Sequence, residues 1–193
     1  HSLSSLDEMS FGEEGFFIVM ITDYIHTQDD SIRYTLGKYC KRPLIFFGVN
    51  PSTASNEQND ATISIVEKVS RSRGYDGYLM LNLYPLRATK ITKVFPLESD
   101  SAIHAQNLAY ISQKIYDRAE LVAAWGTHID DRPYFIDALT EINDIAKEKH
   151  ANWICLSKTK AGHPHHPTRL AYHKMTFEHF DMDCYIQTLK KEK

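Results

Sequence analysis

The chain has few cysteines, no excess of positive charge and no long apolar run, and each of these absences argues against a class of protein. The three cysteines, Cys40, Cys155 and Cys184, are widely separated and form no C-x-x-C pair. Such spacing argues against a four-cysteine iron–sulfur cluster. It fits the reduced thiols of a cytoplasmic protein better than a disulfide framework.

Charge and hydropathy narrow the choice further. The formal net charge of −3 provides no global positive field for nucleic acid, so any contact with DNA requires a local basic surface. No apolar run approaches the roughly 20 residues that cross a bilayer, and we expect no membrane partner. The chain has 193 residues, 42% of them hydrophobic and 24% charged, as in ordinary globular proteins. We predict a single domain over residues 1–193, with an N-terminal β extension over 1–40 and a core over 42–180.

Apolar periodicity predicts alternating strands and helices. Buried apolar runs predict four strands, at residues 44–49, 78–81, 121–125 and 153–156. Helical spacing predicts four helices, at residues 61–72, 100–118, 131–149 and 172–180. Strands separated by helices form right-handed crossovers, so we predict an α/β fold with three layers (α/β/α) and a central, mostly parallel four-stranded sheet. β-prone residues at 16–22 and 34–39 predict an added N-terminal hairpin or edge strands.

Two polar, proline-stiffened loops carry the strongest functional signal. The segment Gly48-Val49-Asn50-Pro51-Ser52 follows the first buried run, and His163-Pro164-His165-His166-Pro167-Thr168 follows the last. Ligand chemistry collects at the carboxyl ends of strands in open α/β sheets. We therefore expect Asn50, Asn82, Gly126 and the 157–168 loop at one edge.

Simpler explanations stay open for most of these residues. Asn50 and Pro51 also fit a turn. Asn82 at a strand end can cap main-chain groups, and Asp60 can cap a helix. The clustered histidines lack a paired cysteine or a helical i, i+4 spacing, so we expect no metal and no other cofactor. Arg87 fits either a solvated face or a phosphate contact.

The order of short motifs resembles a known family. The patterns N-P-S-T-A, D-x-T, N-L-x-x-x-R-A-T, A-W-G and G-x-P-x-H-P follow one another from about Arg42 to Leu170. This series is similar to the family of uncharacterised domains called DUF1643.

The same series also resembles, more remotely, the uracil-DNA glycosylase superfamily. There a first strand ends in G-Q-D-P-Y or G-I-N-P-G, a second in L-L-N and a third in L-W-G, and a late loop reads H-P-S-P-L. The corresponding segments here end or begin at Asn50, Asn82, Gly126 and His166. Two departures stand out. Asn50 replaces a water-activating Asp of many members, as in the mismatch-specific branch, and Arg169 replaces a Pro before the wedge residue.

The resemblance implies a monofunctional DNA glycosylase that flips out a modified base and hydrolyses its glycosidic bond. Catalysis would rest on Asn50, which positions water, and on His166, which stabilises the leaving base, although His163 and His165 stay alternatives. The expected substrate-binding residues are Pro51, Ser52, Asp60, Asn82, Tyr84, Arg87, Gly126 and His163. The expected DNA-binding residues are Lys158, Lys160, Thr168, Arg169 and Leu170, the last as the wedge.

The biological setting and the alternatives follow from the same features. Small residues at Ser52, Thr53 and Ala54 suggest a pocket for a base larger than uracil, and defence against phage DNA with hypermodified bases is a setting that fits. We expect modified DNA as the partner and a monomeric protein. Two other functions stay open: a hydrolase or base transferase for free nucleotides or nucleosides, which the negative charge favours, and a non-catalytic nucleic-acid-binding module.

Overall fold

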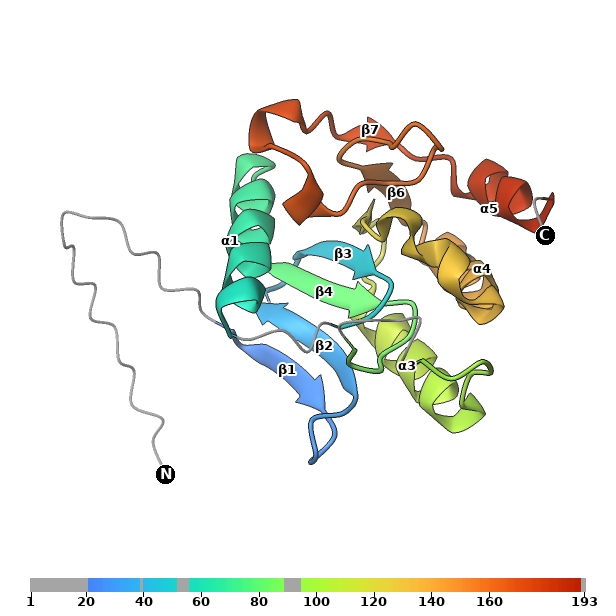
Figure 1. Cartoon of the computed structure of the whole chain (residues 1–193). Coiled ribbons are helices and arrows are strands. Elements are labelled where there is room, and N and C mark those ends of the chain that lie inside the picture. Colours follow the sequence, from blue (N-terminus) through green and yellow to red (C-terminus); the bar gives the residue numbers. More distant parts are fainter. Residues whose placement is uncertain (1–20, 39, 52–55, 89–94, 192–193) are drawn as a thin grey trace, which may run out of the picture.

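A seven-stranded mixed sheet in the order β1-β2-β4-β3-β5-β6-β7 forms the centre of the molecule (Figure 1). The computed structural model describes residues 21–38, 40–51, 56–88 and 95–191, and the side chains of residues 56–60 are not described. The strands are β1 (Asp23–His26), β2 (Arg33–Lys38), β3 (Leu44–Gly48), β4 (Tyr78–Asn82), β5 (Glu120–Ala123), β6 (Asn152–Cys155) and β7 (Glu178–His179).

The four predicted strands form the parallel centre of this sheet. β3 pairs in parallel with β4 on one side and β5 on the other, and β5 pairs in parallel with β6. The predicted number of strands, four, was too small, because antiparallel strands extend both edges of the sheet. The β1–β2 hairpin joins through β2 to β4, and β7 joins β6. Two exposed residues make up β7, too few for a period-2 signal.

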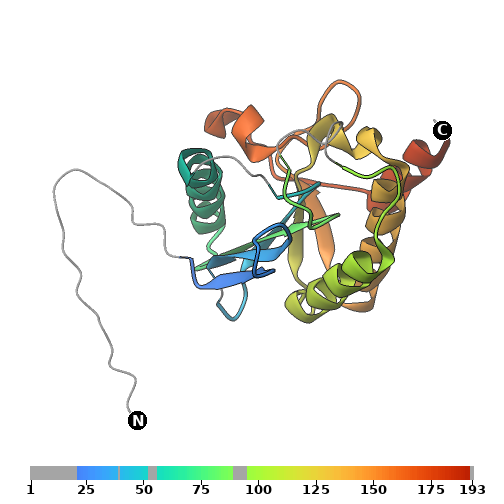
Figure 2. The same cartoon turned by 60° about the horizontal axis from the view of Figure 1, so that its bottom comes forward.

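Helices cover both faces of the sheet (Figure 2). They are α1 (Asn56–Ser72), α3 (Ser101–Lys114), α4 (Pro133–Glu148) and α5 (Met182–Lys191). Apolar residues of α1 pack with Leu44 and Phe46 on one face, while α3, α4 and α5 pack with Ile45 and Phe47 on the other. β3 is therefore buried on both faces, as its unbroken apolar run predicts. In the described part of the chain, no helix is long and apolar enough to span a bilayer.

The predicted helix at 172–180 is wrong. This segment contains a single 3-10 turn at Tyr172–Lys174 and then β7, and the last helix, α5, begins only at Met182. Phe177 has a positive φ of 53°, which an α-helix does not accommodate. The main-chain N–H of Thr176 donates to the carbonyl of Leu156 at 2.6 Å, so pairing with the end of β6 replaces helical bonds.

The N-terminal hairpin is confirmed, with a shifted first strand. β1 occupies Asp23–His26 instead of 16–22, and residues 16–20 lie outside the described part of the chain. Its register with β2 shifts between Ile25 and His26, which marks a β-bulge at Tyr34 of β2. Asp23 accepts a hydrogen bond from Thr35 and pairs with Lys114 of α3. The hairpin is thus bound to the helical layer as well as to the sheet.

The order of connections places a switch point between β3 and β5. The chain leaves β3 through α1 to reach β4 on one side, then crosses through α3 to β5 on the other. The helices after β3 and β5, α1 and α4, lie on opposite faces of the sheet. The loops after these two neighbouring strands therefore diverge, which is the arrangement that opens a ligand site at the carboxyl edge.

The close contact of β2 with β4 generates a prediction for Gly37. A Cβ atom at this position would overlap the main-chain carbonyl of Tyr78 and lie 2.9 Å from Leu79 Cα. Backbone atoms cannot move aside as a flexible side chain can, so we expect Gly37→Ala to lower the free energy of unfolding by about 1–3 kcal/mol or more. Urea denaturation measures this change, with Lys38→Ala as the control in the same strand. A Gly37→Ala protein as stable as the control would show that the two strands lie farther apart.

Candidate functional site

Asn50 follows β3 at the switch point, and its amide is held in one orientation. Its Nδ2 donates to the main-chain carbonyls of Pro51 at 2.9 Å, Ala88 at 2.8 Å and Leu86 at 3.4 Å. Three surrounding carbonyls leave only the nitrogen as an acceptable neighbour, so the side-chain oxygen points away from them. No described residue donates to Oδ1. Asn50 therefore shapes the turn and also presents an oxygen that can accept a hydrogen bond from water.

Asn82 ends β4 directly beside β3, and its side chain has no hydrogen-bond partner among the described residues. It pairs in register with Gly48 and is 5% exposed. Its side chain lies close over the glycine, because a Cβ atom at position 48 would lie 3.0 Å from Asn82 Oδ1. Among the described residues none makes a hydrogen bond with this amide, so it does not cap the strand end. The amide therefore keeps donor and acceptor capacity that a ligand could use.

The histidine loop is closed on itself and joined to the end of β5. The N–H of Gly126, whose φ is +64°, donates to the carbonyl of Pro164 at 2.8 Å. His165 donates from its main chain to Ser157 at 3.0 Å, and Lys158 bridges Pro164 as an isolated antiparallel pair. The predicted convergence of Gly126 with this loop is therefore present in the structure.

His163 points into the protein. Trp125 Nε1 donates to the Tyr185 hydroxyl at 3.0 Å, and that hydroxyl lies 2.8 Å from His163 Nδ1. Nε2 of His163 lies 3.3 Å from a carboxylate oxygen of Asp130. The imidazole is buried, with its side chain 8% exposed. These contacts anchor the loop to the core, and both ring nitrogens have protein partners, so we do not assign His163 to ligand binding.

His166 is a neutral hydrogen-bond donor in a positive setting. Its Nδ1 accepts from the main-chain N–H of Thr168 at 3.3 Å and lies 2.8 Å from the Thr168 hydroxyl oxygen. The proton of the neutral ring is therefore on Nε2, for which no described residue is a partner. Shielding from solvent, with Coulombic repulsion from Arg169 and from the protonated form of His128, lowers the pKa of His166 to about 4. A neutral Nε2–H among positive groups suits the stabilisation of a developing anion.

Several predicted residues have structural partners instead. Tyr84 is 1% exposed, packs against Phe95 and Tyr134, and its hydroxyl accepts from the N–H of Asp100 at 3.0 Å. It is a core residue and not a platform for a base. Leu170 is half-buried against the apolar cluster of the α1 face, so it is not free to act as a wedge.

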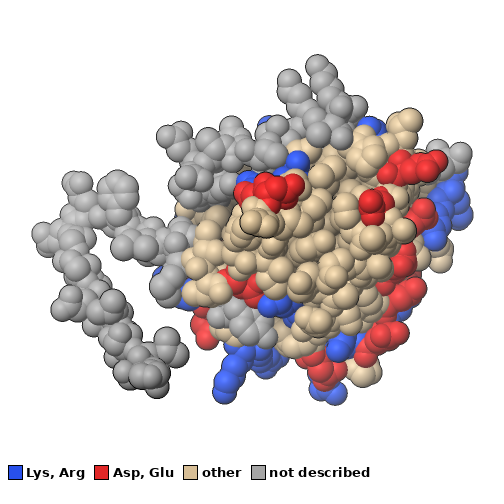
Figure 3. Space-filling model, turned by 90° about the horizontal axis from the view of Figure 1, so that it is seen from below, with Lys and Arg blue, Asp and Glu red and all other residues tan. Residues whose placement is uncertain are grey.

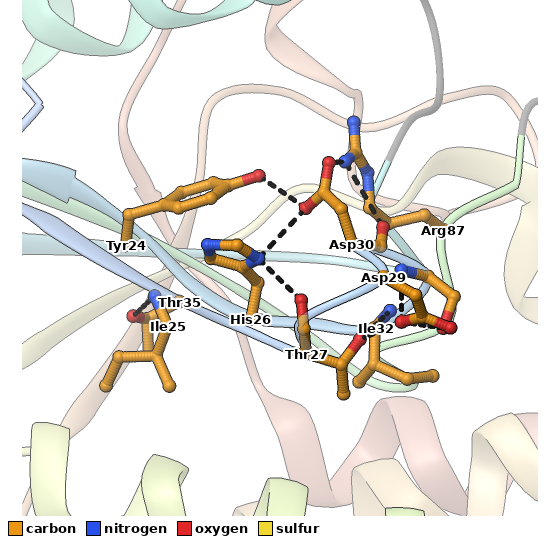
Figure 4. Close-up of polar contacts among 10 residues, drawn as sticks. Tyr24, Ile25, His26, Thr27, Asp29, Asp30, Ile32, Thr35 and Arg87 are labelled. Atoms are coloured by element: carbon orange, nitrogen blue, oxygen red, sulfur yellow. Dashed lines mark hydrogen bonds and ion pairs between the residues drawn. The ribbon is translucent and has the colours of Figure 1, made fainter.

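Arg87 joins the hairpin to the loop after β4. Figure 4 shows that Tyr24, His26 and Arg87 converge on the Asp30 carboxylate. The N–H of Arg87 also donates to the carbonyl of Ser31 at 2.9 Å. This ion pair occupies the guanidinium, and the expected contact with phosphate is replaced by a tertiary link.

The predicted DNA-binding residues lie in and just after the histidine loop, and all of them but Leu170 are exposed. Lys158 lies 4.0 Å from a carboxylate oxygen of Glu178 and 5.6 Å from the centroid of the Phe180 ring. Lys160, Thr168 and Arg169 are exposed. Figure 3 shows acidic and basic side chains intermingled on the face seen from below. The 157–170 loop lies at the opposite end of the molecule, at the top of Figure 1, and the net charge of −3 requires any DNA contact by Lys160 and Arg169 to be local.

The structure describes some of the remaining predicted site residues and not others. Pro51 is buried beside Asn50. Ser52 lies outside the described residues, and Asp60 lies in α1, where its side chain is not described. Asn50, Asn82 and the His166 loop share the carboxyl edge of the sheet, and no contact between their described side chains links the asparagines to His166. The described residues contain no group of three potential metal ligands.

Sequence reasoning missed two residues near this edge. His128, in the 3-10 turn Gly126–Asp131, contributes to the field at His166, and no motif marks it. Arg33 is 6% exposed at the start of β2. A single arginine within a β-prone stretch is the only sequence signal that it carries.

The family comparison agrees with the motif order. The family model described as "Protein of unknown function (DUF1643)" matches residues 33–168, and the chain belongs to this family. The matched segment begins at β2 and includes Asn50, Asn82 and His166, whereas Arg169 and Leu170 fall just beyond it. No curated protein and no solved structure matches the chain.

The lowered pKa of His166 generates a prediction about stability. The pKa falls from 6.5 to about 4 in the folded protein, so between these values the unfolded chain binds more protons. The folded state therefore loses stability as the pH falls from about 6.5 towards 4. We expect His166→Gln to lose less stability than the wild type over this window, measured by urea denaturation at several pH values.

An exposed histidine provides the control for this measurement. His173 is exposed in the 3-10 turn Tyr172–Lys174, so His173→Gln should keep the wild-type dependence on pH. If His166→Gln also follows the wild-type curve, the imidazole of His166 is accessible to solvent and is not held neutral.

Proposed function

We propose that this DUF1643 protein is a DNA N-glycosylase that excises a modified base by hydrolysis and leaves an abasic site. The observation that carries the proposal is the amide of Asn82, which has no hydrogen-bond partner among the described residues and lies at the same carboxyl edge of the sheet as Asn50. The motif order supports it, since it resembles that of the uracil-DNA glycosylase superfamily. We likewise propose the fold of that superfamily for residues 42–180, with the parallel strands β4-β3-β5-β6 as its central sheet.

The proposed reaction requires two kinds of stabilisation. Breaking the glycosidic bond leaves positive charge on the sugar and negative charge on the base. A water molecule held by Asn50 Oδ1 adds to the sugar carbon C1′ and loses a proton to solvent, while the base departs with the bonding electrons and is protonated. An amide cannot act as a carboxylate base, so Asn50 positions the water without deprotonating it. Neutral water is a weak nucleophile, but it is sufficient because the sugar is cationic.

His166 would act on the leaving base. Its Nε2–H can donate to an oxygen or nitrogen that gains charge as the bond breaks. Because the pKa of His166 is about 4, the ring stays neutral over the physiological range, and activity should not depend on its titration near pH 6.5. The positive charge of Arg169 would add to the same stabilisation.

Asn82 would read the extruded base. Its amide has both donors and an acceptor, so it can pair with the Watson–Crick edge of a flipped base. Gly48 beneath it leaves the space that this side chain fills. The small residues Ser52, Thr53 and Ala54 favour a base larger than uracil, which is why we propose phage DNA with hypermodified bases as the setting.

A hydrolase or base transferase for free nucleotides is the second candidate. The net charge of −3 favours a small substrate over long DNA. Such an enzyme would use Asn50, Asn82 and His166 in the same way, but it would not need Arg169 for affinity. Incubation with DNA that carries a panel of modified bases, followed by alkaline cleavage of abasic sites, tests the leading proposal directly.

The two asparagines generate a prediction with distinct signatures. We expect Asn50→Ala and Asn82→Ala each to lower single-turnover rates by about 10²–10³-fold, as for other lost positioning contacts. Asn50→Ala should also lower the melting temperature, because it loses three hydrogen bonds, whereas Asn82→Ala should not. The exposed Asn152 on β6 provides the control variant Asn152→Ala. If the Asn50→Ala protein turns over at the wild-type rate, Asn50 only shapes the turn and does not position water.

The histidine loop generates a prediction that separates the two candidates. We expect His166→Ala to lose turnover on duplex DNA with little change in affinity. Arg169→Ala should bind DNA more weakly and with a shallower dependence on salt. Arg118, whose side chain is 80% exposed, supplies the control Arg118→Ala. If Arg169→Ala binds and cleaves DNA normally, the residue does not contact DNA and the free-nucleotide function is favoured.

A further inference from the structure

Arg33 is a buried arginine for which the described residues provide no acidic partner, unlike comparable arginines. It is 6% exposed, and its Nε has no hydrogen-bond partner among the described residues. Arg73 forms a bidentate pair with Glu120, and Arg87 pairs with Asp30. Among the described residues, no carboxylate forms an ion pair with Arg33.

The position of Arg33 places it near the candidate site. β2 runs antiparallel beside β4, and the N–H of Arg33 donates to the carbonyl of Pro85 at 2.9 Å. Pro85 lies three residues after Asn82, so the main chain of Arg33 is beside the segment that continues from the end of β4. No other described arginine begins a strand of the sheet at this edge.

The side chains of Arg33 and Asn82 lie on the same face of the sheet. Asn82 shares the face of Tyr78 and Met80, which pack in the apolar cluster of α1, because side chains alternate along a strand. Arg33 interacts with the hydroxyl of Tyr24, and Tyr24 pairs with Leu36 of the same cluster. Residues directly opposite on paired strands share a face, so the guanidinium is on the α1 face too.

An uncompensated buried charge is unfavourable for the fold. Removing a guanidinium from water costs several kcal/mol unless a counter-charge and hydrogen bonds replace the water. The neutral phenol of Tyr24 offers a hydrogen bond without charge. Burial also lowers the pKa of Arg33, which is the direction expected for a cation without an anionic neighbour. An anionic ligand would supply what the protein lacks.

We propose that Arg33 binds a phosphate group of the nucleotide whose base is held by Asn82. Guanidinium presents parallel N–H groups that match two oxygens of one phosphate. This inference rests on the proposed function only in taking the ligand to be a nucleotide. The phosphate comes either from the DNA backbone or from a free nucleotide.

Three ligands separate these sources. The probes are deoxycytidine 5′-monophosphate, the uncharged nucleoside deoxycytidine, and a short single-stranded oligonucleotide, each titrated by calorimetry. We expect Arg33→Met to lose at least tenfold in affinity for one of the two phosphate-bearing probes, with no change for the nucleoside. If Arg33→Met loses affinity for the oligonucleotide, and the slope of log K against log salt concentration falls by about 1, the phosphate comes from the DNA backbone. A loss confined to the monophosphate identifies the free nucleotide.

Stability provides an independent readout. Because Met removes an uncompensated charge and keeps apolar volume, we expect Arg33→Met to melt at or above the wild-type temperature. Arg33→Lys keeps the positive charge but loses the parallel N–H donors of the guanidinium. It should therefore bind the phosphate-bearing probes with intermediate affinity. Arg118→Met, at an exposed position, is the control.

The outcomes distinguish this inference from the proposed function. Phosphate binding by the wild type that Arg33→Met abolishes supports the site, even if no DNA base is ever excised. A wild type that binds neither phosphate-bearing probe overturns the proposal. So does an Arg33→Met protein that melts at a lower temperature and binds both probes normally, because Arg33 is then a structural residue.

Discussion

The parallel pairing of β3 with β4 is the interaction on which the rest of the structure depends. β3 is buried on both faces, so its position is determined by the packing of α1 on one side and α3, α4 and α5 on the other. The pairing sets Gly48 directly against Asn82. If the register of β4 against β3 slipped by one residue, Asn82 would turn to the opposite face of the sheet. A neighbouring residue of β4 would then lie opposite Gly48. The chemistry at the carboxyl edge therefore rests on the register of two apolar strands.

Much of the fold can be predicted from the sequence because its strongest signals are local. The four parallel strands are apolar runs that end at polar or glycine residues, and the structure contains all four. The last helix was misplaced because the aromatic and apolar residues of 172–180 imitate helical spacing. The positive φ of Phe177 and the pairing of Thr176 with Leu156 are tertiary effects that periodicity does not reveal.

The candidate site was only partly predictable for a related reason. Asn50, Gly126 and His166 were found because proline, glycine and histidine mark loops at strand ends. Motif order does not report burial, however, so it could not show that Tyr84 packs in the core or that His163 faces Tyr185 and Asp130. Arg33 was missed because the absence of a counter-charge is a property of its surroundings.

The ion pair between Arg87 and Asp30 makes the N-terminal hairpin a mechanical part of the carboxyl edge of the sheet. The segment that contains Arg87 also supplies the carbonyls that orient the Asn50 amide, and it continues directly from Asn82. The hairpin loop thus braces both asparagines from outside the sheet, at a position where sequence can vary without touching a ligand. Substitutions in residues 27–31 would therefore change the alignment of the two amides without changing any residue of the candidate site.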